Sequence, residues 1–166
     1  MEKLIIKRVN KPYEADRDLR RLNRYIVGKG LNKSIEDVRY YGSKGVSKDI
    51  EAASDDMLRL FRYSKRSGKR KAYHIIFSFP AYIEDVNAVR VAIEEVANEI
   101  FRDGYCLVYG LHESKKNLHA HFSIMAVNYR TNRKWHMKKG EFEVWKKKKK
   151  ELIQDILMEY QIILID

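Results

Sequence analysis

Hydrophobic residues recur along this chain with two different spacings, which alternate from one end to the other. Apolar positions three or four residues apart predict helices at about residues 15–26, 50–61, 84–102 and 141–160. Short apolar or alternating segments predict strands at residues 3–9, 72–79, 105–111 and 118–127. We therefore expect a sheet combined with helices, because each kind of element must bury its apolar side against another.

The segments between these elements are rich in glycine and in positive charge. Gly28 and Gly30 are expected to end the first helix, and residues 27–45 have the composition of a loop. Residues 129–139 form a polar, basic segment. In the last helix, a run of consecutive lysines covers more than one turn. Lys149 is the lysine expected to extend its aliphatic stem along the apolar side of this helix.

Histidines cluster on one face of the predicted strands. Alternate residues of a strand point to the same side, so His119 and His121 lie side by side in the segment 118–127. His112 ends the preceding apolar segment, and an antiparallel hairpin would return it beside this pair. Three neutral imidazoles that converge in this way can bind one divalent cation.

Structural zinc is the competing use of such histidines, but closed zinc sites usually include thiolates. Cys106 is the only cysteine, and it lies in an apolar segment. His136, beside Trp135 in the basic loop, is expected to be a structural residue. A zinc finger or zinc ribbon is therefore not expected.

Composition narrows the choice of partner. Among 166 residues, 34 Lys and Arg oppose 23 Asp and Glu, which leaves a formal charge of +11, while 45% of the residues are hydrophobic. A folded, basic protein of this kind is expected to bind polyanions. We expect one domain over residues 1–166, which further domains could follow in a longer protein. The sequence contains no membrane-spanning apolar run and no signal-peptide pattern, so the expected location is the cytoplasm.

Three segments together resemble the relaxase domain of plasmid mobilisation nucleases, which are single-tyrosine members of the HUH endonuclease superfamily. The segments are Leu22 to Ile26 around Tyr25, the strand Tyr73 to Phe79, and His112 followed by His119-Ala-His121-Phe. Their order along the chain is more specific than any single motif. In relaxases of this family the nucleophilic tyrosine precedes the histidine motif, as Tyr25 does here.

The resemblance implies a fold and a catalytic centre. The fold is α+β, with a central antiparallel β-sheet that bears the metal site and helices packed largely on the other face. Tyr25 corresponds to the family's nucleophile. The ligands of a divalent ion, Mn²⁺ or Mg²⁺, correspond to His112, His119 and His121.

Further residues are expected to contact DNA. Ser78 corresponds to a serine of the family's second motif that helps to hold DNA, and His74, on the same strand face, matches a frequent family residue. Arg24 and Lys29 flank Tyr25 and could favour its phenolate form. Basic residues of the loop 129–139 are expected to meet the phosphate backbone. They are Arg130, Arg133 and Lys134.

One departure from the family concerns carboxylates near the histidines. The family usually places Asp two and four positions after the first histidine, where this chain has Ser114 and Lys116. The departure weakens the expectation of a carboxylate that supports the site, and it leaves the three histidines in place.

The expected activity is the nicking of single-stranded DNA at an origin of transfer. Attack by tyrosine would leave a 5′-phosphotyrosine and a free 3′-hydroxyl, which the same site can rejoin. Accessory relaxosome proteins are the further partners expected. Tyr13, Tyr40 and Tyr41 compete with Tyr25 as the nucleophile, and Tyr40 and Tyr41 are expected to lie in a flexible loop.

Two other functions stay open at this point. A rolling-circle replication initiator would use a tyrosine after the histidine motif, which here means Tyr129 or Tyr160. A non-catalytic, single-stranded DNA-binding accessory protein would keep the basic loops and aromatic residues without metal-dependent cleavage.

Overall fold

Strands and helices alternate along residues 3–29, 37–64 and 68–165, which are the residues that this computed structural model describes. Gly30, one of the two glycines expected to end the first helix, lies outside them. In chain order the elements are β1 (Ile5–Arg8), α1 (Asp16–Ile26), β2 (Asp37–Lys44), α2 (Ile50–Tyr63), β3 (Ala72–Ser78), α3 (Val86–Arg102), β4 (Leu107–Glu113), β5 (Leu118–Met125) and α4 (Lys139–Glu159).

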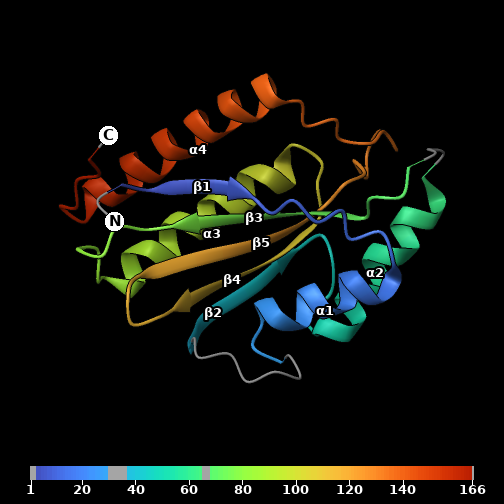
Figure 1. Cartoon of the computed structure of the whole chain (residues 1–166), viewed down its shortest axis with the longest axis horizontal. Helices are drawn as coiled ribbons and strands as arrows, with labels where there is room; N and C mark the ends of the chain where they lie inside the picture. Colours follow the sequence, from blue (N-terminus) through green and yellow to red (C-terminus); the bar gives the residue numbers. More distant parts are fainter. Residues whose placement is uncertain (1–2, 30–36, 65–67, 166) are drawn as a thin grey trace.

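The strands form one sheet with the order β1-β3-β5-β4-β2, and every neighbouring pair is antiparallel. The predicted hairpin between β4 and β5 is present, and β5 is the middle strand of the sheet (Figure 1). The predicted α+β class with a central antiparallel sheet is therefore confirmed.

One face of the sheet packs against the two long helices, α3 and α4. Its centre is aromatic: the rings of Phe77 and Phe122 lie 5.0 Å apart, and Tyr109 stacks on Phe122 at 5.7 Å. Lys149, in the middle of α4, is 2% exposed and forms an ion pair with Glu99 of α3. The predicted burial of the Lys149 stem is therefore confirmed, and its charge is neutralised by the neighbouring helix.

The other face of the sheet carries the histidines, and α1 and α2 cover part of it. Leu19, Leu22 and Ile26 of α1 pack into a second apolar cluster with Val108 and Met125 of the sheet. The helices therefore divide between the faces: α3 and α4 cover one face, as expected, while the shorter α1 and α2 lie on the histidine face.

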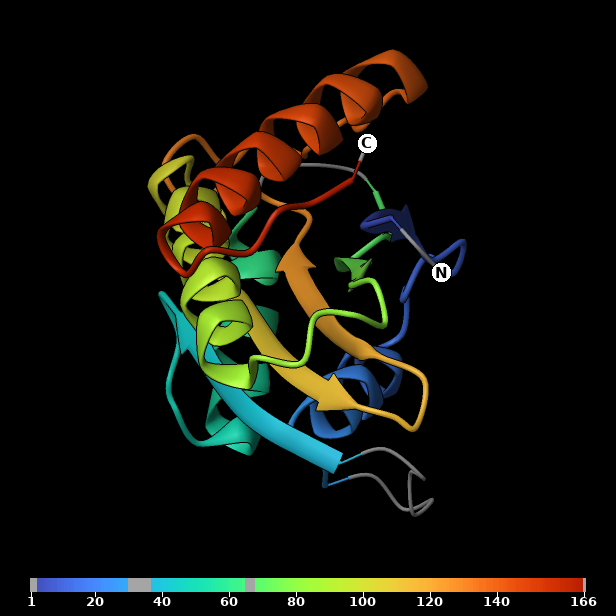
Figure 2. The same cartoon turned by 90° about the vertical axis from the view of Figure 1, so that its left-hand side faces the viewer.

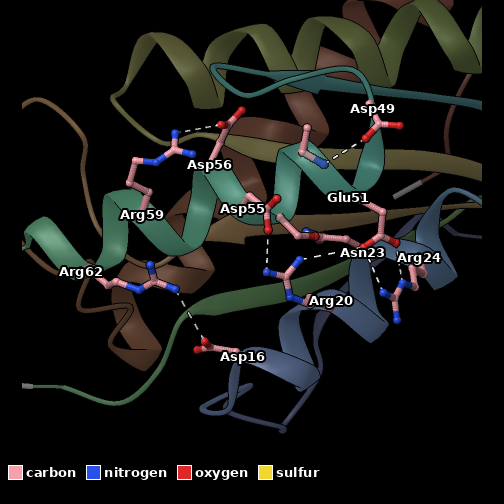
Figure 3. A network of polar contacts seen from close by, with 12 residues as sticks. Asp16, Arg20, Asn23, Arg24, Asp49, Glu51, Asp55, Asp56, Arg59 and Arg62 are labelled. Carbon is pink, nitrogen blue, oxygen red and sulfur yellow. Dashed lines mark hydrogen bonds and ion pairs between the residues drawn. The ribbon is translucent and has the colours of Figure 1, made fainter.

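Ion pairs join α1 to α2 along their exposed sides (Figure 3). Arg20 of α1 lies 2.6 Å from Asp55 of α2, and Arg24 lies 2.6 Å from Glu51. Exposed pairs of this kind contribute little stability. They do fix which way the two arginines point, because both guanidinium groups face α2.

The strand β2 corrects the prediction that residues 27–45 form a loop. Residues 37–44 pair with β4 along their whole length, with an irregularity between Val38 and Tyr40. The prediction was wrong because β2 is an edge strand whose residues are half-buried or exposed, and Gly42 interrupts its apolar residues. Such a strand has little of the apolar alternation on which sequence reasoning relies.

Both ends of the described chain lie at the same end of the sheet. Lys3 forms a bridge with Ile165, and the segment after α4 returns toward β1 (Figures 1 and 2). Among the described residues, none of the helices has the length and apolar character needed to cross a bilayer.

Candidate active site

The register of the sheet brings residues from three strands, β3, β5 and β4, into two adjacent rows on the histidine face. In one row, Ser78 of β3 is paired with His119, which is paired with His112 of β4. In the next row, His121 lies between Ile76 of β3 and Gly110 of β4. Neighbouring strands are about 4.8 Å apart, so this register alone places the three histidines in contact.

The three predicted histidines converge in the structure. One nitrogen from each of His112, His119 and His121 lies within 4.8 Å of the other two, and all three residues are buried. The ring centroids of His112 and His121 are 4.5 Å apart, and those of His119 and His121 are 5.2 Å apart. The predicted grouping is therefore present, and metal binding stays a prediction.

The position of His112 depends on a main-chain group. Its Nε2 lies 2.8 Å from the carbonyl oxygen of Ile26, at the end of α1. A carbonyl only accepts hydrogen bonds, so Nε2 carries the proton and Nδ1 holds the lone pair of the neutral ring. Gly110 permits this contact, because a Cβ atom there would lie 2.4 Å from the same carbonyl oxygen. Neither Gly110 nor Ile26 was predicted as a site residue.

Tyr25 lies beside the histidines because of the way α1 ends. Gly28 adopts a positive φ of 82°, its N–H donates to the Tyr25 carbonyl, and the Lys29 N–H donates to the Arg24 carbonyl. This Schellman motif ends the helix at Ile26, as the glycine predicted. The Tyr25 ring is 5.3 Å from that of His112 and 5.1 Å from that of His121, and both contacts are edge-on.

A buried chain of hydrogen bonds extends from the triad through β3 to the segment before α1. His121 Nδ1 lies 2.9 Å from His74 Nε2, and His74 Nδ1 lies 2.9 Å from the Tyr13 hydroxyl. Burial lowers the pKa of His74 to about 4, and the neighbouring His112 and Lys7 act in the same direction. Burial, followed by the neighbouring histidines, also lowers the pKa of His121. Both rings are therefore neutral near pH 7, as a metal ligand must be.

His74 was predicted to contact DNA, and this stays a prediction, although the residue lies among protein groups. The residue is 6% exposed, and both of its ring nitrogens are engaged with protein groups. Ser78, on the same strand, is half-buried next to His119 and keeps a position where a bound strand could reach it. The guanidinium of Arg24 is held by Glu51 of α2 through two hydrogen bonds.

The basic loop lies far from the histidines. Val127 bridges to Lys134, and six residues of extended chain separate Val127 from His121, about 20 Å at 3.3 Å per residue. Arg130 and Arg133 are exposed in the same loop. Tyr129 also belongs to this end, where it stacks on Phe101 at 5.5 Å. Tyr160 follows α4, on the far side of the sheet from the triad.

The other candidate tyrosines occupy structural positions. Tyr40 and Tyr41 belong to β2 rather than to a flexible loop. Tyr40 donates a hydrogen bond to Glu94 of α3 at 3.2 Å, on the opposite face. Tyr41 is two strands from His121, about 10 Å. Tyr13 is 7% exposed, and burial followed by the charge of Asp18 raises its pKa.

Part of the histidine face is accessible beside the triad. The helix α1 covers β4 and β5, whereas Ile76 and Ser78 of β3 are half-buried. On β1, Lys7 pairs with Ile76 and Ile5 pairs with Ser78, and Ile5 is 46% exposed. Ile5 therefore extends the row of His119, and Lys7 extends the row of His121, toward solvent. Neither residue was predicted from the sequence, because only the register of the sheet places them there.

Comparison with known proteins gives one family. The model of the family described as "Relaxase: MobA/VirD2-like, nuclease domain" matches residues 25–161. A structure solved in work on the molecular basis of vancomycin resistance transfer in Staphylococcus aureus is similar, with a TM-score of 0.69 over 95% of this chain and 94% of that one. The two sequences are 14% identical, so the likeness shows a shared fold. No curated protein matches the chain at a significant level.

Proposed function

We propose that this chain, which belongs to the MobA/VirD2-like relaxase nuclease domains, nicks one strand of DNA at an origin of transfer with Tyr25 as its nucleophile. The observation that carries the proposal is the position of Tyr25, whose ring contacts two of three converging histidines. A nucleophile beside a set of potential metal ligands is an arrangement that supports phosphodiester cleavage. A tyrosine with only a packing role would not need to lie beside these histidines.

The three histidines fit a divalent cation such as Mn²⁺ or Mg²⁺. His112 keeps a lone pair on Nδ1, and His121 Nε2 is buried with no hydrogen-bond partner among the described residues. When bound, the ion would withdraw negative charge from the non-bridging oxygens of the scissile phosphate. Neutral imidazoles are suitable ligands for this purpose, because they leave the charge of the cation undiminished.

Tyr25 would supply the attacking oxygen. The phenolic oxygen forms a bond to phosphorus while the bond from phosphorus to the 3′-oxygen breaks, and the 3′-oxygen leaves as a hydroxyl after taking up a proton. A phenol with a pKa of about 10 is a weak nucleophile at neutral pH until a nearby cation favours its anion. Of the two predicted cations, Lys29 is the better candidate for this role, since Glu51 already neutralises Arg24.

The DNA strand would lie across β3 and β1. Ser78 could donate a hydrogen bond to a phosphate next to the cleaved one, Lys7 could pair with a further phosphate, and Ile5 offers an apolar surface to a base. Unpaired bases can make such contacts, whereas stacked base pairs cannot, so the substrate is single-stranded. Arg130, Arg133 and Lys134 would meet DNA several nucleotides away. Because the substrate is DNA, the reaction would take place in the cytoplasm. Accessory relaxosome proteins would open the duplex to expose the single strand.

The proposal is tested by covalent capture of DNA. We would incubate the protein and Mn²⁺ with 3′-labelled single-stranded oligonucleotides of randomised sequence, then separate the products on a denaturing gel. Wild type should form a labelled adduct that resists SDS, and no adduct should form when EDTA is present from the start. The variant Tyr25→Phe removes only one hydroxyl and should form none. Tyr63→Phe is the matched control, because Tyr63 is 73% exposed at the end of α2.

Two outcomes would redirect the proposal. An adduct that persists in Tyr25→Phe and is lost in Tyr41→Phe would keep the chemistry and move the nucleophile. If wild type binds the oligonucleotides and forms no adduct with either metal, the protein is a DNA-binding accessory factor instead.

A further inference from the structure

Two residues outside the triad, Tyr13 and His74, connect to it through hydrogen bonds that no solvent reaches. Both are buried, at 7% and 6% exposure. His74 lies between Tyr13 and His121, with nitrogen or oxygen partners 2.9 Å away on each side. The chain of contacts joins the loop before α1, the strand β3 and the strand β5. These segments are far apart in sequence.

The backbone of Tyr13 indicates that this contact is built at a cost. Tyr13 has a φ of 50°, in the left-handed region that an aromatic residue rarely adopts. The Lys71 N–H donates to the Tyr13 carbonyl at 3.3 Å, which ties the strained residue to the start of β3. Strained backbone of this kind persists where surrounding structure enforces it, often beside a functional site. Here the strain places the hydroxyl group against His74.

The proton positions in this chain determine whether His121 can bind a metal. Two imidazole nitrogens 2.9 Å apart share one proton, so either His121 Nδ1 or His74 Nε2 carries it. If His74 is the donor, neutral His121 carries its own proton on Nε2, the buried nitrogen without a partner among the described residues. That nitrogen then has no lone pair for a cation. If His121 is the donor, Nε2 is free to coordinate.

We propose that Tyr13 and His74 are positioning residues that hold His121 in the tautomer with its lone pair on Nε2. His121 donates through Nδ1 to His74 Nε2, and His74 donates through Nδ1 to the Tyr13 oxygen. Tyr13 completes the chain, because without its oxygen the Nδ1 proton of His74 would be buried without an acceptor. The inference rests on the proposed metal site and assigns it an outer shell made of a histidine and a tyrosine. In other metal sites a carboxylate or carbonyl commonly accepts this bond.

Metal affinity tests the relay with variants that differ in one hydrogen bond. His74→Leu removes the acceptor and should raise the Kd for Mn²⁺, measured by calorimetry, by about 10–100-fold, the usual effect of losing such a partner. His74→Gln keeps an oxygen that can accept from His121 and should recover most of this loss. Tyr13→Phe should weaken binding by a smaller factor. Tyr73→Phe is the matched control: it also removes a buried tyrosine hydroxyl, but on the opposite face, where that hydroxyl donates to the Trp135 carbonyl.

A tautomer measurement separates the relay from simple loss of packing. In protein labelled with ¹⁵N at histidine and loaded with Mg²⁺ or Zn²⁺, which are diamagnetic, NMR should show the proton of His121 on Nδ1 and that of His74 on Nδ1. Equal Mn²⁺ affinity in wild type, His74→Leu and Tyr13→Phe would overturn the relay while the metal site stands, and so would a His74 proton on Nε2 in the loaded protein. If wild type binds no divalent metal, the relay and the proposed metal site fail together.

Discussion

The two faces of the central strand are equally buried and serve different purposes. In β5, Ala120, Phe122 and Ile124 point toward α3 and α4, while His119, His121 and Ser123 point to the other face. On the first face each side chain packs against other apolar groups. On the second, His121 Nε2 and Ser123 Oγ are buried with no hydrogen-bond partner among the described residues. Unpartnered polar groups reduce stability, so the apolar face contributes more to the stability of the fold than the histidine face does.

The largest effect expected from this comparison is on the apolar face. Phe122→Ala removes a fully buried ring that contacts Phe77 and Tyr109, and should lower the free energy of unfolding by about 3–5 kcal/mol. Denaturation in urea, followed by circular dichroism, measures this change. A loss below about 1 kcal/mol would show that the aromatic cluster does not carry the stability assigned to it.

Acid should weaken the fold through the histidine face. Burial lowers the pKa of His74 to about 4, whereas an unfolded histidine titrates near 6.5. Between these values the unfolded state binds a proton that the folded state does not, so stability falls as the pH falls. For His74 the loss is about 1.4 kcal/mol per pH unit, or about 3 kcal/mol at pH 4. Urea titrations of metal-free protein from pH 7 to pH 4 measure this loss of stability. In His74→Gln, the free energy of unfolding should depend less on pH. An unchanged curve in that variant would contradict this source of acid sensitivity.

The smallest effect on stability is expected from removing the ligands themselves. The double variant His119→Ala, His121→Ala should lose Mn²⁺ binding, which wild type should show at about one ion per chain. The free energy of unfolding of this double variant should fall by less than that of Phe122→Ala. The reason is that removing the two imidazole rings breaks few apolar contacts. Calorimetry and urea denaturation of the same samples give both values. Mn²⁺ binding that survives the double substitution would rule out this site.

A part of the molecule could be predicted when its pattern lies within one short segment of the sequence. The hairpin and the convergence of His112 with His119 and His121 follow from a period of two residues and one tight turn, both readable in sequence. Lys149 was also predictable, because a lysine run longer than a helical turn must place one member on the buried side. By contrast, β2 is an exposed edge strand, and its weak alternation has the appearance of a loop.

The remaining site residues depend on tertiary structure. Tyr13 and His74 are separated by 61 positions, and nothing in either segment indicates that they form a hydrogen bond. The Ile26 carbonyl that orients His112 is a main-chain group, which every residue possesses. Gly110 is a site residue only because α1 lies against β4 at that point. Sequence pattern therefore located the three converging histidines, and the groups that contact them came from the packing of α1 and β3.

Identification of the residue that carries the DNA tests the central claim most directly. The covalent adduct would be trimmed with nuclease, digested with trypsin and sequenced by tandem mass spectrometry. Cleavage after Arg24 and Lys29 releases the peptide Tyr25 to Lys29, and the account predicts that a nucleotide is attached to its tyrosine through a 5′-phosphate. A nucleotide on the peptide Val9 to Arg17, which contains Tyr13, or on the peptide Tyr40 to Lys44 would contradict the assignment of Tyr25 as the nucleophile.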